Sequence, residues 1–485
     1  MTQSTTFAEQ QGSKPGRLAR EQTLAQAIKF HLDNEKVSFH TPGHKGRFKV
    51  PLFDSLETPF AIDLTELPGL DELSEASSVL EAMQSNIAEI FGASESYISV
   101  NGASAALSAA IMSCAHRGKK IILPRDVHRS ALNAVILSGL EPVFYQPHFC
   151  TEWQIPFTIP IEVIERLLAE TPDVAAVVLC SPNYSGLVSD ISAVVKTCKS
   201  KSIVSIIDEA HGAHFSSSAA FPASALSFGG DLVVHSLHKT LCAPTQTGLL
   251  HVGKNALVEP KSIGSFLNIV QSSSPSYLLM AGIERALDGD LHSQNAAANA
   301  IQLCSRIRKF INSHPDYVAL EGVVDPLHIL FKHRVLSAEQ LNCFLQQNGI
   351  FSETILGNGV LLLVGFGSLP SDIDYLIRCL ENLETSAIAS TPEETIPTSA
   401  HFAAPGKQLM NPRKAFFARS QMVDAAMAAG CISAENYAPC PPGWAVLLAG
   451  QEINSSIQSQ ISATRKVRVV SSPLEGDSDG SNTPS

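Results

Sequence analysis

Hydrophobic runs along the first half of the chain predict a parallel β-sheet covered by helices. Between about Tyr97 and Val252, short apolar runs alternate with stretches of helical periodicity. Such alternation is typical of a mostly parallel sheet with helices on both faces. Seven runs have the length of buried strands: Tyr97–Val100, Lys120–Leu123, Pro142–Tyr145, Val174–Cys180, Ile203–Ile207, Asp231–His235 and Leu249–Val252.

The flanking segments predict further helices and a second, smaller α/β unit. Arg20–Asn34 has helical character, and a long helical stretch is expected from about Pro275 to Ser313. Beyond residue 317, expected strands at His328–Lys332 and Gly359–Gly365 mix with expected helices at Ser337–Asn348 and Ser371–Glu384. An amphipathic helix is predicted by i, i+3, i+4 spacing of Ala76, Val79, Leu80, Met83, Ile87, Ile90 and Phe91.

These patterns divide the chain into several parts. Its 485 residues suit two or three domains with large cores. A linker is indicated by the Thr, Ser, Ala and Pro that follow residue 385. We expect a disordered segment at 1–18, a large domain at 19–310, a small α/β domain at 311–385, a linker at 386–410, a C-terminal domain at 411–465 and a disordered tail at 466–485.

Composition narrows the class of protein. Hydrophobic residues make up 45% and charged residues 16%, as in an ordinary soluble globular protein. The net charge is −12 and no basic run stands out, so nucleic acid is not an expected partner. The ten cysteines form no CxxC pair, which favours reduced thiols in the cytoplasm and no metal site. No segment has the pattern of a secretory signal or a membrane span.

Groups with chemical potential follow several of the predicted strands. Asp208 ends the strand Ile203–Ile207 within DEAHGAH, and Lys239 lies just past Asp231–His235 within SLHKTL. After Tyr97–Val100 comes NGASAALSAA, where the backbone N–H groups of Ala103 and Ser104 and the Ser104 hydroxyl can hold phosphate oxygens. His128, in PRDVHRS, opens the next expected helix. We expect these groups to meet at the carboxyl edge of the sheet.

Together these groups match the needs of pyridoxal 5'-phosphate. That cofactor requires a lysine for its aldehyde, a carboxylate for its pyridine nitrogen, a helix N-terminus for its phosphate and a flat group against its ring. Each residue alone has an ordinary explanation: Asp208 as a turn residue, Lys239 as a solvated lysine, His128 as a helix cap and NGAS as a common strand–helix turn. Their joint order and spacing favours the cofactor site.

Longer segments carry a resemblance that covers Ser38 to Ile453. They are FHTPGHKGR, DLTELPGLDEL, NGASAA, PRDVHRSALNAVILSGLEPVF, DEAHGAH, SLHKTLCAPTQTGLLH, SSSPSYLLMAGIERA, NPRKAFFA and ISAENYAPCPPG. In these the chain resembles the bacterial ornithine/lysine/arginine decarboxylases, in the compact form without the N-terminal response-regulator-like domain. The resemblance implies an α/β, aspartate-aminotransferase-like (fold type I) large domain with a mainly parallel seven-stranded sheet, plus smaller C-terminal α/β domains.

The resemblance also implies roles for individual residues. Lys239 would form the imine, Asp208 would pair with the pyridinium and His128 would stack on the ring. After CO₂ leaves, Lys239 or His238 would return a proton to Cα. Ser273 and Ser274 resemble a segment that the neighbouring subunit inserts, so a homodimer or higher homo-oligomer with shared sites is expected. Residues implied near the cofactor are Ala103, Ser104, His211, Ser236 and His238.

The implied activity is decarboxylation of a basic amino acid to a polyamine-pathway amine. The family commonly ends its C-terminal motif on an acid, but here PPGWAVLLAGQE places Gln451 at that position, with Glu452 next to it, and Lys414 replaces a common Glu in NPRKAFFA. A neutral Gln451 suits a guanidinium better than an ammonium, so arginine is slightly favoured over lysine and ornithine. The alternatives are an aminotransferase or lyase on the same fold and an inactive cofactor-binding regulatory subunit.

Overall fold

The computed structural model describes residues 23–34, 42, 62–322, 324–383, 406–438, 445–461 and 464–471. Four parts of the sequence predictions lie wholly or mostly outside these residues. They are the disordered segment 1–18, the loop Ser38–Arg47 apart from Pro42, most of the linker 386–410 and the tail 466–485 beyond residue 471.

The large domain is built on a seven-stranded sheet, and the seven strands predicted from the sequence are confirmed. The sheet order is β1-β9-β8-β7-β6-β2-β3. Strand β9 runs antiparallel to β1 and β8, and the remaining neighbours are parallel. The strands are β1 (Glu95–Ser99), β2 (Lys120–Pro124), β3 (Glu141–Tyr145), β6 (Val174–Cys180), β7 (Val204–Asp208), β8 (Leu232–Ser236) and β9 (Gly248–Val252).

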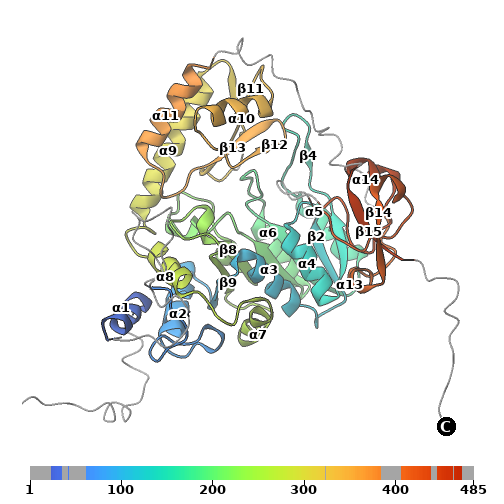
Figure 1. The fold of residues 1–485 in the computed structure, drawn as a ribbon, viewed down its shortest axis with the longest axis horizontal. Coiled ribbons are helices and arrows are strands. Elements are labelled where there is room, and N and C mark those ends of the chain that lie inside the picture. Colours follow the sequence, from blue (N-terminus) through green and yellow to red (C-terminus); the bar gives the residue numbers. More distant parts are fainter. Residues whose placement is uncertain are drawn as a thin grey trace, which may run out of the picture.

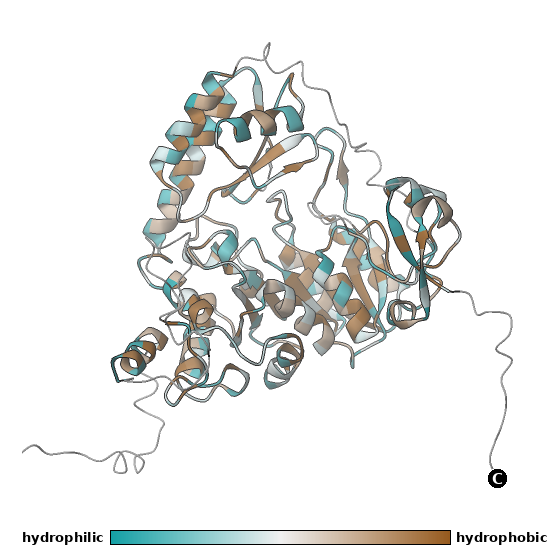
Figure 2. Ribbon diagram, in the orientation of Figure 1, coloured by the Kyte–Doolittle hydropathy of each residue, from teal (hydrophilic) through white to brown (hydrophobic). Residues whose placement is uncertain are grey.

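Alternate residues of these strands bury into two separate cores, one on each face of the sheet. Ile122, Val177 and Leu179 pack with helices α1 (Leu24–Asn34), α2 (Val79–Phe91), α5 (Ile161–Glu170), α6 (Ile191–Ser200) and α8 (Tyr277–Ala286). Ile121 and Val178 pack with α3 (Gly102–Ser113), α4 (Arg129–Ser138) and α7 (Pro260–Val270). The sheet is therefore covered on both faces, and its strands are strongly hydrophobic (Figures 1 and 2).

The small domain is an antiparallel sheet with helices packed on it. Its strands lie in the order β10-β11-β13-β12. The expected long helix over Pro275–Ser313 is wrong: it is interrupted, and Ser293 caps a new helix by accepting a hydrogen bond from the Ala296 N–H. The boundary expected at residue 310 also falls inside that helix, whose buried side chains join the small-domain core. The elements are α9 (Gln294–Ser313), β10 (Tyr317–Ala319), β11 (His328–His333), α10 (Ala338–Gln347), β12 (Thr354–Leu356), β13 (Gly359–Leu363) and α11 (Pro370–Glu381).

A C-terminal unit packs beside the large domain (Figure 1). It contains α13 (Pro412–Phe417), β14 (Ser420–Asp424), α14 (Ser455–Gln460) and β15 (Lys466–Val470). The disordered tail expected from residue 466 is wrong for its first residues, because β15 pairs with β14 and buries Val467 and Val469. Smaller elements are β4 (Phe149–Cys150), β5 (Ile155–Pro156), η4 (Leu73–Glu75), η5 (Phe215–Ser217), η6 (Ala225–Phe228), η7 (Leu237–Lys239) and η9 (Ala425–Met427).

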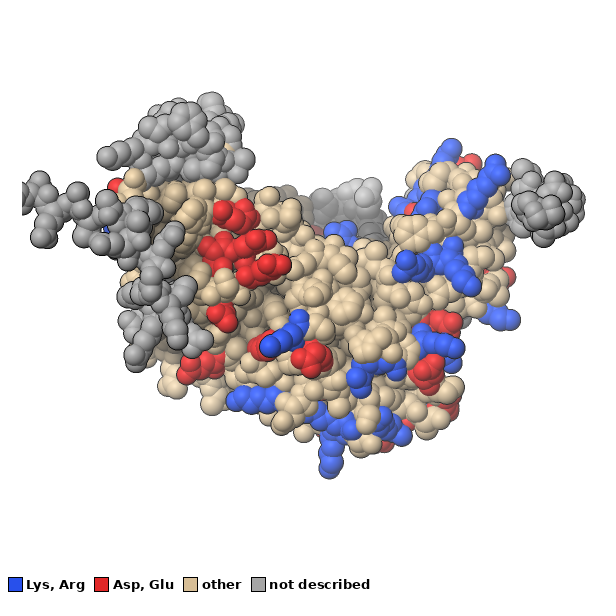
Figure 3. Space-filling view, turned by 90° about the horizontal axis from the view of Figure 1, so that it is seen from below, with Lys and Arg blue, Asp and Glu red and all other residues tan. Residues whose placement is uncertain are grey.

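Charge is unevenly distributed over the surface. Seen from below, acidic side chains gather on the side of α1 and α2, and Lys and Arg side chains gather toward the C-terminal unit (Figure 3). Among the described residues, no helix combines the length and the apolar character that a bilayer crossing requires.

The small domain meets the large domain at Gly186, in the loop after β6. The Asp325 N–H donates to the Gly186 carbonyl at 2.8 Å, and Leu187 pairs with Val324 as an isolated bridge. Gly186 has φ +86°, and a Cβ on it would lie 2.4 Å from the Cβ of His328. Only glycine therefore lets the two domains approach this closely.

Gly186→Ala should lower the free energy of unfolding by about 2–5 kcal/mol, since it adds a clash to left-handed strain. Gly349→Ala is the matched control, because Gly349 has φ +71° and no atom within 4 Å of a built Cβ. The control should cost only the strain, about 1–2 kcal/mol. Denaturant unfolding measures both. An equal loss in the two variants would show that the Gly186–His328 contact is unimportant.

Candidate active site

A cavity of about 430 Å³ lies at the carboxyl edge of the large-domain sheet. Asp208 ends β7, Ser236 ends β8, and Lys239 ends the 3₁₀ turn η7 that follows β8. His128 precedes α4 after β2, and α3 begins after β1. The residues predicted for the cofactor that line this cavity are Ala103, Ser104, His128, Asp208, His211, Ser236, His238 and Lys239.

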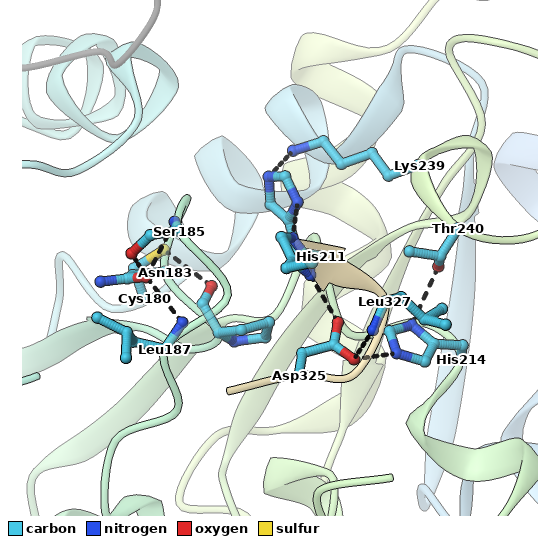
Figure 4. Close-up of polar contacts among 12 residues, drawn as sticks. Cys180, Asn183, Ser185, Leu187, His211, His214, Lys239, Thr240, Asp325 and Leu327 are labelled. Carbon is cyan, nitrogen blue, oxygen red and sulfur yellow. Dashed lines mark hydrogen bonds and ion pairs between the residues drawn. The ribbon is translucent and has the colours of Figure 1, made fainter. Parts of the chain in front are cut away.

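The Lys239 amine is held by a histidine from the neighbouring strand end. Its Nζ lies 2.8 Å from Nε2 of His211. Figure 4 shows this contact as a dashed line. Burial lowers the pKa of His211 well below its ordinary value, and the positive charge of Lys239 lowers it further. The His211 ring is therefore neutral, and its Nε2 can accept a hydrogen bond from the amine.

Asp208 places its carboxyl group in the same cavity. Its side chain is nearly buried, with 6% of the residue exposed, and Oδ1 accepts a hydrogen bond from the Ala210 N–H at 3.2 Å. The charges of Asp208 and Lys239 both act on His128: burial lowers the His128 pKa, Asp208 opposes this and Lys239 adds to it. The three side chains therefore share one electrostatic environment.

His128 both caps α4 and lines the cavity. Its Nδ1 accepts hydrogen bonds from the Ser130 N–H at 3.2 Å and the Ser130 hydroxyl at 2.8 Å. This contact fixes the ring orientation and leaves the proton on Nε2. The capping explanation open at the sequence level is thus correct, and it also holds the imidazole at the cavity wall.

The beginning of α3 forms another wall. Asn101, Gly102, Ala103 and Ser104 line the cavity there. The first N–H groups of a helix have no partner within the helix and favour an anion. A Cβ on Gly248 would lie 2.5 Å from the Ala103 nitrogen, so this glycine allows β9 to pass directly beneath the turn. The arrangement suits a phosphate group.

Several residues of the cavity were not predicted. Asp126 lines it two positions before His128, and burial raises its pKa to about 6. Asn183 organises the loop after β6, since its Oδ1 accepts from the N–H groups of Ser185 and Leu187 and from the Ser185 hydroxyl. The position of Asp126 in PRDVHRS, close to His128, could have predicted it as a cavity residue. Nothing in the sequence around Asn183 indicated that it lines the cavity.

Four predicted residues do not line the cavity of their own chain. Ser273 and Ser274 are exposed in the segment between α7 and α8. Gln451 is 2% exposed inside the C-terminal unit, and the Glu452 N–H donates to the Lys407 carbonyl in that unit. The contact of these four residues with substrate or cofactor stays a prediction, and for Ser273 and Ser274 that contact requires a second chain.

Comparison with known proteins assigns the family. Residues 22–330 match the family model described as Orn/Lys/Arg decarboxylase, major domain. The chain belongs to the Orn/Lys/Arg decarboxylase family. It is 31% identical over 453 residues to uncharacterized protein YaaO of Bacillus subtilis, covering 90% of this chain and 93% of that one. It is 29% identical to an arginine decarboxylase of Halalkalibacterium halodurans, covering 95% and 96%.

Solved structures confirm the fold. Lysine decarboxylase A from Pseudomonas aeruginosa superposes with a TM-score of 0.76 at 18% identity, covering 94% of this chain and 81% of that one. The family, the enzyme class of amino-acid decarboxylase and the aspartate-aminotransferase-like fold predicted from the sequence are thereby confirmed.

His128 both caps α4 and lines the cavity, so two substitutions can distinguish the stability that comes from the capping hydrogen bond from that which comes from packing of the ring. His128→Ala should lower the free energy of unfolding by about 1 kcal/mol, because the Ser130 N–H loses its acceptor. His128→Asn should keep most of that stability, since its side-chain oxygen can cap the helix. Urea unfolding of the cofactor-free chain measures both. Equal losses would show that packing of the ring, and not the cap, stabilises α4.

Proposed function

We propose that this enzyme decarboxylates a basic amino acid with pyridoxal 5'-phosphate, and that Lys239 carries the cofactor. The observation that supports it is one cavity, in a decarboxylase-family chain, that collects the Lys239 amine, the Asp208 carboxyl, the His128 ring and the first turn of α3.

The donor set fits this cofactor. An amine is present for the aldehyde, and the carboxyl of Asp208 can pair with a protonated ring nitrogen. A neutral imidazole at His128 offers a flat face without adding positive charge. The N–H groups of Ala103 and Ser104 suit the phosphate. When bound, pyridoxal phosphate supplies the electron sink for the pair released as the Cα–carboxylate bond breaks.

The chain's own residues then handle the proton that replaces CO₂. Lys239 Nζ is one donor to Cα, because Lys239 lines the cavity and its amine contacts His211 there. His238 is the other, since its Nδ1 lies 3.3 Å from Ser236 Oγ in the wall of the cavity. Burial lowers the His238 pKa, so the ring, once protonated, gives up its proton readily.

Arginine is the substrate that we favour, ahead of lysine and ornithine. The support is the arginine decarboxylase of Halalkalibacterium halodurans, which matches along nearly the full length of both chains. Gln451 adds no support to this preference within one chain, because it is buried away from the cavity. The product would be agmatine, a polyamine-pathway amine, formed in the cytoplasm.

The purified chain loaded with pyridoxal phosphate should release CO₂ from arginine without any keto-acid acceptor. Arginine, lysine and ornithine assayed side by side as ¹⁴C-carboxyl substrates measure this, and kcat/KM should be highest for arginine. Lys239→Ala should abolish release. Asp208→Asn should reduce it by several orders of magnitude, because an amide cannot hold the ring nitrogen protonated.

Three outcomes would contradict the proposal. Turnover that requires a keto acid would indicate an aminotransferase. Cofactor absorbance without turnover of any of the three substrates would indicate a regulatory subunit. Near-normal activity of Asp208→Asn would remove the role given to that carboxylate.

We further propose that the active unit is a homodimer with shared sites. The segment that contains Ser273 and Ser274 stands at the rim of the cavity, since the neighbouring Ser272 N–H donates to Asn101 Oδ1 at 3.2 Å. The two serines are exposed and so are accessible to a second chain. Two-fold pairing is also the commonest way for identical chains to assemble.

Mixing inactive subunits tests this arrangement. Lys239→Ala chains mixed with Ser273→Ala/Ser274→Ala chains should regain up to about a quarter of the wild-type activity, because half of the dimers are hybrids with one intact site. Lys239→Ala mixed with Asp208→Asn is the matched control and should regain none, since both residues line the same chain's cavity. Equal behaviour of the two mixtures, or full activity in a monomer, would contradict shared sites.

A further inference from the structure

Behind the cavity, a closed ring of buried polar groups begins and ends at the turn that carries Lys239. His211 Nδ1 lies 3.1 Å from His328 Nε2, and His328 Nδ1 lies 2.7 Å from Asp325 Oδ2. His214 connects Asp325 Oδ1, at 2.9 Å, to the hydroxyl of Thr240, at 3.2 Å. Asp325, His214 and His328 are fully buried. Figure 4 shows how His214 lies between Asp325 and Thr240.

The carboxylate of Asp325 sets the direction of every hydrogen bond in this ring. Burial alone would raise its pKa, but His214 and His328 reverse the effect and hold the pKa well below the ordinary value. An ionised carboxylate only accepts, so a neutral His328 ring donates to it through Nδ1 and keeps the lone pair of Nε2 as an acceptor. His211 then donates through Nδ1, which leaves the lone pair of Nε2 facing Lys239.

We infer that Asp325 and His328 are positioning residues that fix the tautomer of His211, so that its cavity-facing nitrogen always accepts a hydrogen bond from Lys239. An acceptor at this place favours the ammonium form of Lys239, the form that can deliver a proton. The inference rests on the proposed function only in taking Lys239 as the cofactor lysine.

The ring also joins the two domains. His211 and Lys239 belong to the large domain, whereas His328 begins β11 of the small domain and Asp325 directly precedes that strand. The Asp325 N–H donates to Gly186, and the absence of a side chain at Gly186 lets His328 reach His211. The position of the small domain therefore determines whether the Lys239 acceptor is held in place.

Other groups also act on this corner of the cavity, and the test must leave them unchanged. Tyr184 packs edge-on against the His211 ring at 5.2 Å. The titratable groups whose charges act on His211, or that line the cavity with it and Lys239, are His128, His214, His328, Asp126, Cys180, Asp208 and His238.

A second buried chain in the same sheet provides a control. Glu209 Oε1 lies 2.8 Å from His235 Nε2, His235 Nδ1 lies 3.0 Å from His251 Nε2, and His251 Nδ1 lies 2.7 Å from Ser96 Oγ. It has the same order of carboxyl, histidine and histidine, but none of its members lines the cavity. His251→Gln therefore disturbs an equivalent buried chain without touching Lys239.

The proton affinity of Lys239 Nζ is the quantity to measure. The full-length chain, freed of cofactor, is trace-labelled with acetic anhydride over a range of pH, and acetylation of the Lys239 peptide is quantified by mass spectrometry. Asp325→Asn removes the charge that fixes the ring, and His328→Phe removes the acceptor for His211 Nδ1. Either change lets His211 present an N–H to the amine. In each, the midpoint of labelling should fall by about one pH unit, a tenfold loss of proton affinity.

His251→Gln should leave the midpoint where it is in the wild type. The cofactor-loaded enzyme gives a second reading, since the pH midpoint of its visible absorbance should move in Asp325→Asn and His328→Phe and stay in His251→Gln. Far-UV circular dichroism identifies any variant that does not fold. If Asp325→Asn or His328→Phe fails to fold, the labelling midpoint of the other one decides the test. The inference would be overturned if folded Asp325→Asn and His328→Phe kept the wild-type midpoint. An equal shift of the midpoint in His251→Gln would overturn it too. Either result leaves the proposed function intact if wild-type CO₂ release still depends on Lys239.

Discussion

The carboxyl ends of β2, β6, β7 and β8 meet at one edge of the large-domain sheet, and the turns leaving these ends carry the chemistry. Because the strands are parallel, groups distant in sequence arrive at the same edge together. Asp208 ends β7, Lys239 ends the turn after the adjacent strand β8, and the charges of both act on His128, which follows β2. The site is thus a consequence of sheet topology, which rigid hydrophobic cores on both faces hold in place.

Burial then determines the protonation of the groups so collected. Desolvation lowers the pKa of His128, His211 and His238, so three imidazoles stand neutral around one amine. An unpaired positive ring beside Lys239 would repel the ammonium, whereas a neutral nitrogen lone pair holds it. Asp325 is fully buried, and His214 and His328 stabilise its ionised form. Its negative charge orients the hydrogen bonds of the histidines behind the cavity.

Sequence patterns were sufficient for the parts of this arrangement that are local. Each strand of the sheet is a short apolar run, and Asp208, Lys239 and the α3 turn follow those runs directly. Sequence patterns could not predict contacts between residues that are far apart in the chain. His211 and His328, for example, are hydrogen-bonded although they lie 117 positions apart. Nothing near Asp325 marks it as part of the site. The break before α9 was missed although Asp288, Gly289 and Asp290 interrupt the apolar pattern there. Gln451 was chosen from a motif alone and is buried outside the cavity of its own chain, so its contact with substrate stays a prediction.

The roles proposed for Asp208, His128 and His211 all depend on Lys239 being the lysine that carries the cofactor. Borohydride reduction of the chain loaded with pyridoxal phosphate would fix the cofactor to its lysine, and digestion with peptide mass spectrometry would locate it. We predict that the reduced phosphopyridoxyl group is found on the peptide that contains Lys239 and on no other. A label on a different lysine would contradict the account, and so would the absence of any label on a folded chain.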